Sequence, residues 1–310
     1  MGKDSRIEWT HHTFNPWIGC VKVSEGCRFC YAEGMSKRTG KAKWGPLGQG
    51  TRTMTGADYW RQPIVWNADC ERRGVRERVF CASMADIFEA WPGPMRSGGL
   101  DKRVLKRDDG RALLMDDVRQ SLVELIEATP WLDWLLVTKR PQNVRPMWPN
   151  PRIGATSIMP RNVWVLASIE DDMTAAQRVP VLRGVPAAVR GLSFEPMLGQ
   201  VRMSALLDPL CVERMPQIDW VIIGVESRGS RVGRLDLTGD WKEQTWLDVA
   251  EETVEACRNA GVAVFVKQIP HAGMVLHRNA DGTWPDAWPQ VLRVQDLPVS
   301  PAALLPVSRA

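Results

Sequence analysis

The chain has 310 residues, of which 44% are hydrophobic and 25% charged, and its net charge is +4. This composition is typical of a globular protein and excludes a fibrous, a wholly disordered or a coiled-coil chain. The sequence has no run of about 18 apolar residues, so we predict no membrane span. Its charged beginning lacks the apolar segment of a secretory signal, and we therefore expect a cytoplasmic protein.

The first predicted strand covers residues 13–18, and a cluster of cysteines follows it. Cys20, Cys27 and Cys30 lie close together, whereas the other four of the seven cysteines are scattered. An odd number of cysteines in a cytosolic chain argues against a disulfide framework. We interpret the scattered ones as small buried apolar side chains, namely Cys70, Cys81, Cys211 and Cys257.

Residues 34–78 stand apart from the pattern of apolar strands. This segment is rich in glycine and basic residues, and aromatic residues alternate with the basic ones: Trp44, Tyr59, Trp60 and Trp66. Alternating cations and rings are typical of a surface that follows a nucleic-acid backbone and stacks on its bases. We therefore predict an insertion that contacts nucleic acid, with DNA favoured; a solvated basic flap is the alternative.

Two apolar runs, at residues 78–83 and 133–138, predict the next strands, and residues 113–126 between them have helical spacing. Ser83 and Asp86 close the first run, where a carboxylate could receive an amino group; Asp86 could instead cap a helix. Lys139 and Arg140 close the second, where they could hold a carboxylate or a phosphate. Plain solvation of two basic residues is the alternative there.

Four further strands are predicted at residues 163–168, 188–194, 219–224 and 262–267. Their nearly continuous apolar runs are typical of strands buried on both faces of a parallel sheet. Helices are expected just after residue 171 and at residues 246–257. Beyond residue 270, a Pro-rich tail (271–310) is expected to pack on the rest of the chain as irregular structure.

Polar side chains also close these later strands. Ser168 could bind a ribose hydroxyl, and Glu195 could point into a central cavity. Glu226 follows Gly224, which would let a ligand approach the backbone. In parallel barrels the chemistry lies at the carboxyl ends of the strands, so these residues, with Ser83, Asp86, Lys139 and Arg140, are the candidate cofactor-binding set. No catalytic residue is assigned.

The three clustered cysteines point to a metal centre. A zinc site needs four ligands in a standard spacing, and neither His11 and His12 nor Cys70 and Cys81 complete one. Three thiolates suit a [4Fe–4S] cluster whose fourth iron stays open. An open iron can chelate S-adenosylmethionine (SAM), and an electron from the cluster then cleaves the sulfonium to give a carbon radical. A structural zinc ion and unrelated buried thiols remain alternatives.

Several motifs carry a resemblance to a known family. IEWTHHTFNPWIGCVKVSEGCRFCYAE (7–33) resembles the opening of the phage-associated three-cysteine-motif proteins, a radical-SAM-like family of uncharacterised function. Matching motifs follow in order: VFCASMADIFE (79–89), LLVTKRPQN (135–143), VWVLASIE (163–170), LSFEPMLGQV (192–201), WVIIGVESRGSR (220–231) and AGVAVFVKQ (260–268). The resemblance therefore covers residues 7–268.

The resemblance implies an α/β fold, a partial parallel TIM-like barrel of the radical SAM type with about six to seven strands, over residues 1–270. It implies that Cys20, Cys27 and Cys30 bind a [4Fe–4S] cluster. It also implies a separately encoded partner protein for some members, and DNA-lesion repair resembling that of photoproduct lyases. Most radical SAM enzymes have three residues between the first two cysteines, and this chain has six between Cys20 and Cys27.

These observations predict a radical-SAM-like enzyme, lyase-like or hydrogen-abstracting, that acts on nucleic acid. One alternative keeps the cluster without SAM cleavage, as a redox or nucleic-acid-binding module that works with a partner. A third possibility is a zinc-stabilised binding protein of phage origin without catalysis.

Overall fold

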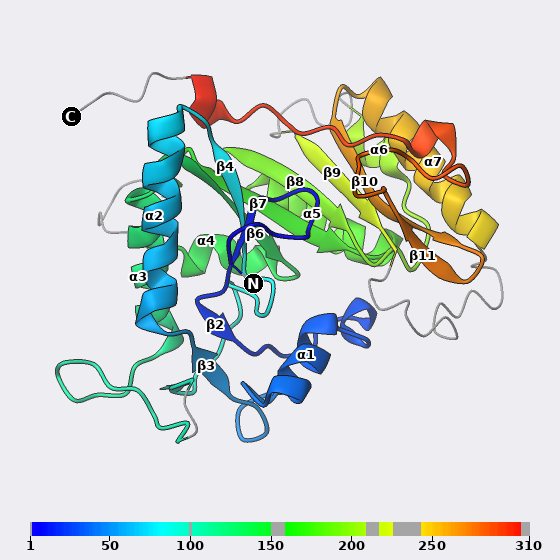
Figure 1. The fold of residues 1–310 in the computed structure, drawn as a ribbon. Helices are drawn as coiled ribbons and strands as arrows, with labels where there is room; N and C mark the ends of the chain where they lie inside the picture. The colour runs from blue at the N-terminus through cyan, green and yellow to red at the C-terminus, as the bar shows by residue number, and fades with distance from the viewer. Residues whose placement is uncertain (1, 99–100, 150–158, 209–216, 226–242, 305–310) are drawn as a thin grey trace. The chain divides into compact units, whose positions relative to one another are not determined.

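A computed structural model describes residues 2–98, 101–149, 159–208, 217–225 and 243–304 (Figure 1). The chain forms two compact units. Unit 1 comprises residues 1–165, 186–188 and 300–310, and unit 2 comprises residues 166–185 and 189–299. Each unit contains parallel strands and the helices that follow them along the chain.

Unit 1 begins with two short strands, β1 (His12–Phe14) and β2 (Trp17–Ile18). A single strand was predicted across residues 13–18, but Asn15 and Pro16 interrupt it, because proline has no N–H to donate to a strand ladder. β1 pairs in parallel with β4 (Glu77–Cys81), which pairs in parallel with β6 (Leu132–Thr138). β2 instead joins β3 (Arg52–Met54) and β5 (Met95–Arg96) in a separate sheet.

The helices of unit 1 follow these strands. They are α1 (Tyr31–Thr39), α2 (Ala57–Arg73), α3 (Met115–Glu127) and the single turn α4 (Val144–Met147), with short 3-10 turns η1 (Glu25–Cys27) and η2 (Pro141–Asn143). α2 packs on β6 and ends at Gly74, whose φ of 66° suits a left-handed helix cap. In the core, Phe14 meets Trp134 edge to face at 5.6 Å.

Unit 2 has a parallel set of strands with one antiparallel strand at its edge. β8 (Val189–Phe194), β9 (Trp220–Gly224) and β10 (Ala263–His271) pair in parallel. β11 (Met274–His277) pairs antiparallel with β10. The helices are α5 (Asp172–Arg183), α6 (Met203–Leu207) and α7 (Glu243–Asn259), followed by the 3-10 turn η4 (Gln290–Leu292). Figure 1 shows α7 beside β10, on which it packs.

β7 (Val163–Ile169) belongs to both units, and the larger sheet has eight strands in the order β1-β4-β6-β7-β8-β9-β10-β11. The predicted partial TIM-like barrel of six to seven parallel strands is therefore wrong. The sheet has an additional antiparallel strand, and the described residues also form a second, three-stranded sheet.

The missed strands lacked a sequence signal for physical reasons. β11 lies in the tail that was expected to be irregular, and the turn before it has Ala272 and Gly273 with φ of 48° and 73°. Such a turn is ordinarily recognised by Asn or Asp at its first position, and here alanine stands there. β2, β3 and β5 have two or three residues each, which is too few for a periodic pattern.

Candidate functional site around the cysteine loop

The three clustered cysteines lie on residues 19–30, which we call the cysteine loop. Cys20 follows β2, Cys27 ends η1, and Cys30 immediately precedes α1. All three thiols are free and partly buried. The sequence therefore places three potential thiolate ligands on one loop of unit 1.

Both ends of the cysteine loop are attached to the segment that follows β4. The Gly19 N–H donates to the Met84 carbonyl at 3.1 Å, and the Tyr31 hydroxyl donates to the Ser83 carbonyl at 2.8 Å. Gly19 has φ of 118°, and a Cβ there would lie 2.5 Å from the Thr51 carbonyl oxygen. Only glycine fits where the loop begins.

Cys30 lies directly before the first turn of α1. Burial raises the pKa of the Cys30 thiol, and the backbone N–H groups of Glu33 and Ala32 in that turn oppose the effect. N–H groups at a helix N-terminus stabilise negative charge. The position is therefore suited to a thiolate that is neutralised by a bound metal.

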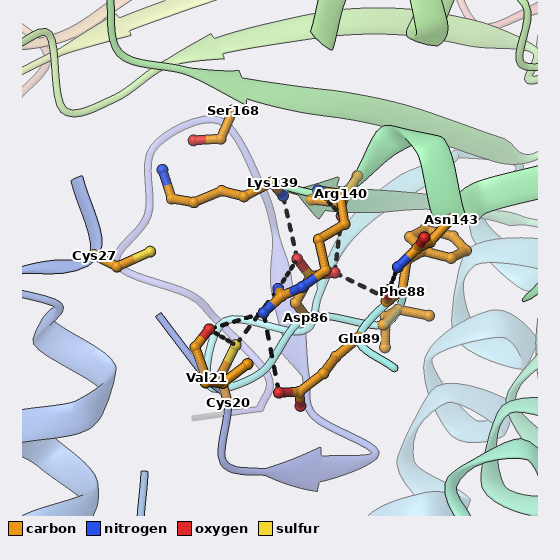
Figure 2. Close-up of polar contacts among 12 residues, drawn as sticks. Cys20, Val21, Cys27, Asp86, Phe88, Glu89, Lys139, Arg140, Asn143 and Ser168 are labelled. Carbon is orange, nitrogen blue, oxygen red and sulfur yellow. Dashed lines mark hydrogen bonds and ion pairs between the residues drawn. The ribbon is translucent and has the colours of Figure 1, made fainter. Parts of the chain in front are cut away.

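Arg140, just beyond the end of β6, contacts the first cysteine (Figure 2). Its Nη1 lies 3.8 Å from the Cys20 Sγ, and its Nη2 donates to the Val21 carbonyl at 2.8 Å. Burial raises the pKa of Cys20 to about 12, with a further contribution from Glu89, while the Arg140 cation opposes the shift. An unliganded Cys20 is therefore a neutral thiol at pH 7.

Asp86 holds Arg140 in this position. One oxygen of the Asp86 carboxylate accepts from Arg140 Nη1 at 2.7 Å and from the Lys139 N–H at 3.2 Å. The other accepts from the Thr138 hydroxyl at 2.8 Å and from the Phe88 N–H at 3.0 Å. Two predicted ligand-binding residues, Asp86 and Arg140, are thus brought together, and each is bound by groups of the protein itself.

A second buried ion pair, which sequence reasoning missed, supports the first. Arg52 on β3 binds both carboxylate oxygens of Glu89 at 2.6 Å, and its guanidinium lies 4.0 Å from the Trp91 ring centroid. Arg52 is 0% exposed and Glu89 1% exposed. Glu89 also lies 4.0 Å from Arg140 Nη2. From the sequence, Arg52 was one of the basic residues of segment 34–78, and the residues around it carry no signal that distinguishes a buried arginine from the exposed ones.

Ser83 and Lys139 complete the predicted residues of unit 1. The Ser83 hydroxyl accepts from the Asn15 side-chain amide at 3.1 Å, and Asn15 also accepts from the Met84 N–H. Asn15, between β1 and β2, therefore orders the segment after β4 and was not singled out from the sequence. Lys139 is placed next to Asp86 by its backbone N–H.

The other predicted site residues belong to unit 2. The Ser168 hydroxyl donates to the Glu195 carbonyl at 3.1 Å, and the Glu195 carboxylate pairs with Lys267 Nζ at 2.9 Å. A Cβ at Gly224 would lie 2.4 Å from that carboxylate, so the glycine makes room for Glu195. Ser168 thus lies near the end of β7 and Glu195 directly after β8, and Lys267, within β10, pairs with Glu195. Glu226 lies outside the described residues.

The two histidines at the start of β1, His11 just before the strand and His12 as its first residue, have partners of their own. His12 Nε2 lies 2.7 Å from Glu77, and its ring stacks on Trp66 at 4.2 Å. His11 Nδ1 accepts the Arg78 N–H at 2.8 Å. Both rings connect β1 to neighbouring elements of unit 1.

The basic segment 34–78 is largely structural. Tyr59 stacks on Phe14 at 5.1 Å, and Trp66 is buried. Cations on α2 pair with acids of the same helix: Arg61 with Asp58, and Arg72 and Arg73 with Asp69. We call residues 37–43 the basic turn. Its cations Arg38, Lys41 and Lys43 are exposed and lie outside α2. The Lys102 ammonium donates to the Gly40 carbonyl at 2.8 Å and adds a further cation to this turn.

Two features are absent from the described part of the chain. None of the described helices is long and apolar enough to cross a membrane. Within the same residues, no group of three or more His, Cys, Asp or Glu side chains is arranged so that it could hold a single metal ion.

One comparison with known proteins gives a match. A protein-family model described as "Protein of unknown function (DUF5131)" matches residues 4–92 and 110–283. No curated protein and no solved structure matches the chain.

Proposed function

The chain belongs to the DUF5131 family, whose function is unknown, and we propose that it is an iron–sulfur protein in which Cys20, Cys27 and Cys30 hold a [4Fe–4S] cluster. The observation that carries this proposal is the cysteine loop itself: three partly buried thiols on one loop, with a buried arginine against one sulfur. The wider proposal is radical SAM chemistry on a nucleic acid.

The donors of the cysteine loop fit such a cluster. Three thiolates leave one of four irons open, and the irons are spread out, so the sulfurs need not converge on one point as they must around a single ion. A guanidinium would face the Cys20 sulfur, and the positive end of α1 would lie next to Cys30. Hydrogen bonds and positive charge at the sulfurs stabilise bound clusters.

Burial disfavours the thiolate form of the free cysteines, and a bound metal would favour it. Burial raises the pKa of Cys20 to about 12, so the side chain keeps its proton at neutral pH. A coordinating metal ion removes that proton outright. Cluster binding would therefore release protons and would stabilise the loop that supplies the ligands.

When bound, a cluster with an open iron supplies a site for SAM and the electron that cleaves it. The chain's own residues would orient the cluster: Gly19 and Tyr31 fix the two ends of the cysteine loop, and Arg140 fixes its first ligand. Because Asp86 and Arg140 bind each other, we assign them no contacts with SAM. Ser83 and Lys139 stay in the proposed set on unit 1, which carries the cysteine loop, and Ser168 and Glu195 stay proposed ligand-binding residues of unit 2.

One observation favours a second candidate, an iron–sulfur redox or nucleic-acid-binding module without SAM cleavage. Asp86 and Arg140 have the charges that would suit the amino and carboxylate groups of SAM. They instead form an ion pair with each other, with Arg140 Nη1 2.7 Å from the Asp86 carboxylate. In that case the cluster would transfer electrons or hold the loop in shape, and a partner would supply the remaining chemistry.

A nucleic-acid partner is proposed from the basic turn. Arg38, Lys41 and Lys43 are exposed and close together in sequence, as expected of cations that contact phosphates. A separately encoded partner protein is proposed on the family resemblance alone. A cytoplasmic location completes the proposal, because reducing conditions keep thiols free for metal.

The test is anaerobic purification followed by metal analysis and spectroscopy of the reduced protein with and without SAM. We expect nearly four irons per chain and a change of the reduced-cluster signal on addition of SAM, with 5′-deoxyadenosine formed on reduction. Iron without any response to SAM supports the redox or binding module. Zinc without iron would overturn both candidates.

Two variants separate ligation from folding. Cys27→Ala removes a proposed ligand, and we expect it to lose most of the iron while the iron-free protein stays as stable as the parent. Cys257→Ala is the matched control, because Cys257 is a fully buried thiol on α7 in unit 2. The control should keep its iron and lose about 1 kcal/mol of stability through the small cavity.

A further inference from the structure

We propose that Arg140 is a positioning residue of the cluster site, which fixes the first ligand Cys20 and places a positive charge against its sulfur. This inference rests on the proposed function, because it gives a role to a side chain next to a ligand of the cluster. Arg140 was expected to bind a small anion, and the structure instead directs its guanidinium at the cysteine loop (Figure 2).

The guanidinium of Arg140 contacts two adjacent residues of the cysteine loop. Nη1 is shared between Asp86, at 2.7 Å, and the Cys20 sulfur, at 3.8 Å. Nη2 donates to the Val21 carbonyl at 2.8 Å. The fork of one side chain therefore holds the side chain of one loop residue and the backbone of the next. A lysine has a single nitrogen and no planar fork, so it could supply the charge without the two-point attachment.

The structure around Arg140 holds its side chain rigidly. Arg140 is only 6% exposed, and it follows a strand whose last residue, Thr138, accepts the Arg140 N–H at 2.9 Å. Asp86 fixes the guanidinium from the segment after β4. The cysteine loop is thus attached to the ends of β4 and β6 through one cation, and a rigid support is what a preorganised site requires.

The buried charges around Arg140 balance one another. Arg140 and Arg52 face Asp86 and Glu89, so the buried group has two positive and two negative charges. Arg140 without its neighbours would be costly to bury, and the Asp86 carboxylate at 2.7 Å and Glu89 at 4.0 Å offset that cost. Without Arg140, the two carboxylates would stand next to Cys20 with an excess of negative charge, which disfavours a thiolate ligand.

Arg140 would affect the cluster in two ways: how firmly the chain retains iron, and how easily the cluster is reduced. A cation close to a ligand sulfur stabilises the reduced cluster, which carries one more electron, so it raises the reduction potential. Attachment of Val21 and Cys20 keeps the ligand in place when the iron is challenged by a chelator. The two effects depend on different properties of Arg140, its charge and its fork.

The experiment compares the full-length parent with Arg140→Met, Arg140→Lys and the control Arg76→Met after anaerobic reconstitution with iron and sulfide. Arg76 pairs with Asp133 at 2.7 Å, so the control removes another arginine–carboxylate pair of unit 1, and Arg76 lies far in sequence from the cysteine loop. The measurements are iron per chain, the midpoint potential, the rate of iron loss to a chelator, and urea unfolding of the iron-free protein.

We expect Arg140→Met to bind less than half of the parent's iron and to shift the midpoint potential of what remains to more negative values. Arg140→Lys should keep a potential close to the parent's and lose iron to the chelator at least fivefold faster. Arg76→Met should match the parent in iron and potential, whatever its stability. If Arg140→Met does not fold, the chelator rate of Arg140→Lys decides alone.

Three outcomes overturn the inference. If Arg140→Met binds as much iron as the parent and has the same midpoint potential, Arg140 has no role toward the cluster. If Arg140→Lys loses iron to the chelator at the parent's rate, Arg140 does not position the ligand. If Arg76→Met loses as much iron as Arg140→Met, the effect is a general destabilisation of unit 1. A parent protein that takes up no iron would instead overturn the proposed function, so the two failures are distinguishable.

Discussion

At the scale of single residues, this protein shows how a cysteine motif depends on side chains far from it in sequence. Cys20, Cys27 and Cys30 were evident from their spacing, because three closely spaced cysteines in an odd total of seven are typical of a metal site rather than a disulfide framework. The residues that support them were not. Asn15, Arg52 and Glu89 act through buried contacts, and no local pattern distinguishes a buried arginine from an exposed one.

Gly19→Ala is predicted to destabilise the start of the cysteine loop. The new Cβ would meet the Thr51 carbonyl oxygen at 2.5 Å, and φ of 118° is strained for any residue with a Cβ. We expect a loss of about 2–4 kcal/mol in the free energy of unfolding, measured by urea denaturation. Gly40→Ala is the control, because Gly40 has φ of 63° and nothing within 4 Å of its Cβ position. It should cost about 1 kcal/mol; equal costs would show that the contact with Thr51 is unimportant.

At the scale of secondary structure, the long elements could be predicted and the short ones could not. The apolar runs of β4, β6, β7, β8, β9 and β10 gave strands at the expected places, and the helical spacing gave α3 and α7. The helix expected after residue 171 is α5, with Asp171 accepting the Thr174 N–H as its cap. The fold class was nevertheless wrong. β2, β3 and β5 are defined by pairing between distant segments rather than by their own composition, and β11 forms a hairpin with β10 through a turn whose sequence carried no signal.

The junction between β1 and β4 is predicted to weaken in acid. Burial, and then the Arg78 cation, lower the pKa of His11 from 6.5 to about 4. Protonation would also remove the acceptor of the Arg78 N–H. Because the folded pKa is depressed, the unfolded chain takes up the proton first, so stability is complete above about pH 6.5 and falls as the pH drops toward 4. We expect about 1–2 kcal/mol from this half-buried ring.

The measurement is urea unfolding of the parent and His11→Asn between pH 7.5 and about 4. Asparagine keeps an oxygen that can accept the Arg78 N–H, and it does not titrate in this range. The difference between the two proteins should shrink steadily toward pH 4. A difference that stays constant across the range would mean that His11 does not control this part of the pH profile.

At the scale of the whole molecule, a net charge of +4 says less than its distribution. On α2 the cations are paired with acids of the same helix, and the aromatic rings of that segment are packed within unit 1. Within α2, the alternation of rings and cations is therefore accounted for by an amphipathic helix. The basic turn lies at the end of α1, the helix that begins directly after the cysteine loop, and its cations are exposed.

The double variant Lys41→Glu with Lys43→Glu is predicted to weaken the binding of a single-stranded DNA oligonucleotide about tenfold or more. The dependence of affinity on salt should also become shallower by about two counterions, because two phosphate contacts are lost. The control Arg61→Glu with Arg72→Glu makes the same change of net charge on α2, where both cations are exposed but paired. Fluorescence anisotropy at several salt concentrations measures both. Equal weakening by the two variants would mean that net charge, rather than the basic turn, governs binding.

The attachment of Cys20 to Arg140 also fixes an order of events during synthesis. The two residues are 120 positions apart, and at typical translation rates the ribosome needs about 6–24 s to add that length of chain. When the first thiol leaves the ribosome, the arginine and the strand end that hold it in the folded chain have not yet been synthesised. Under the proposed function, delivery of a cluster to its final site would therefore follow the synthesis of Arg140, and until then the thiols would depend on reducing surroundings to stay free.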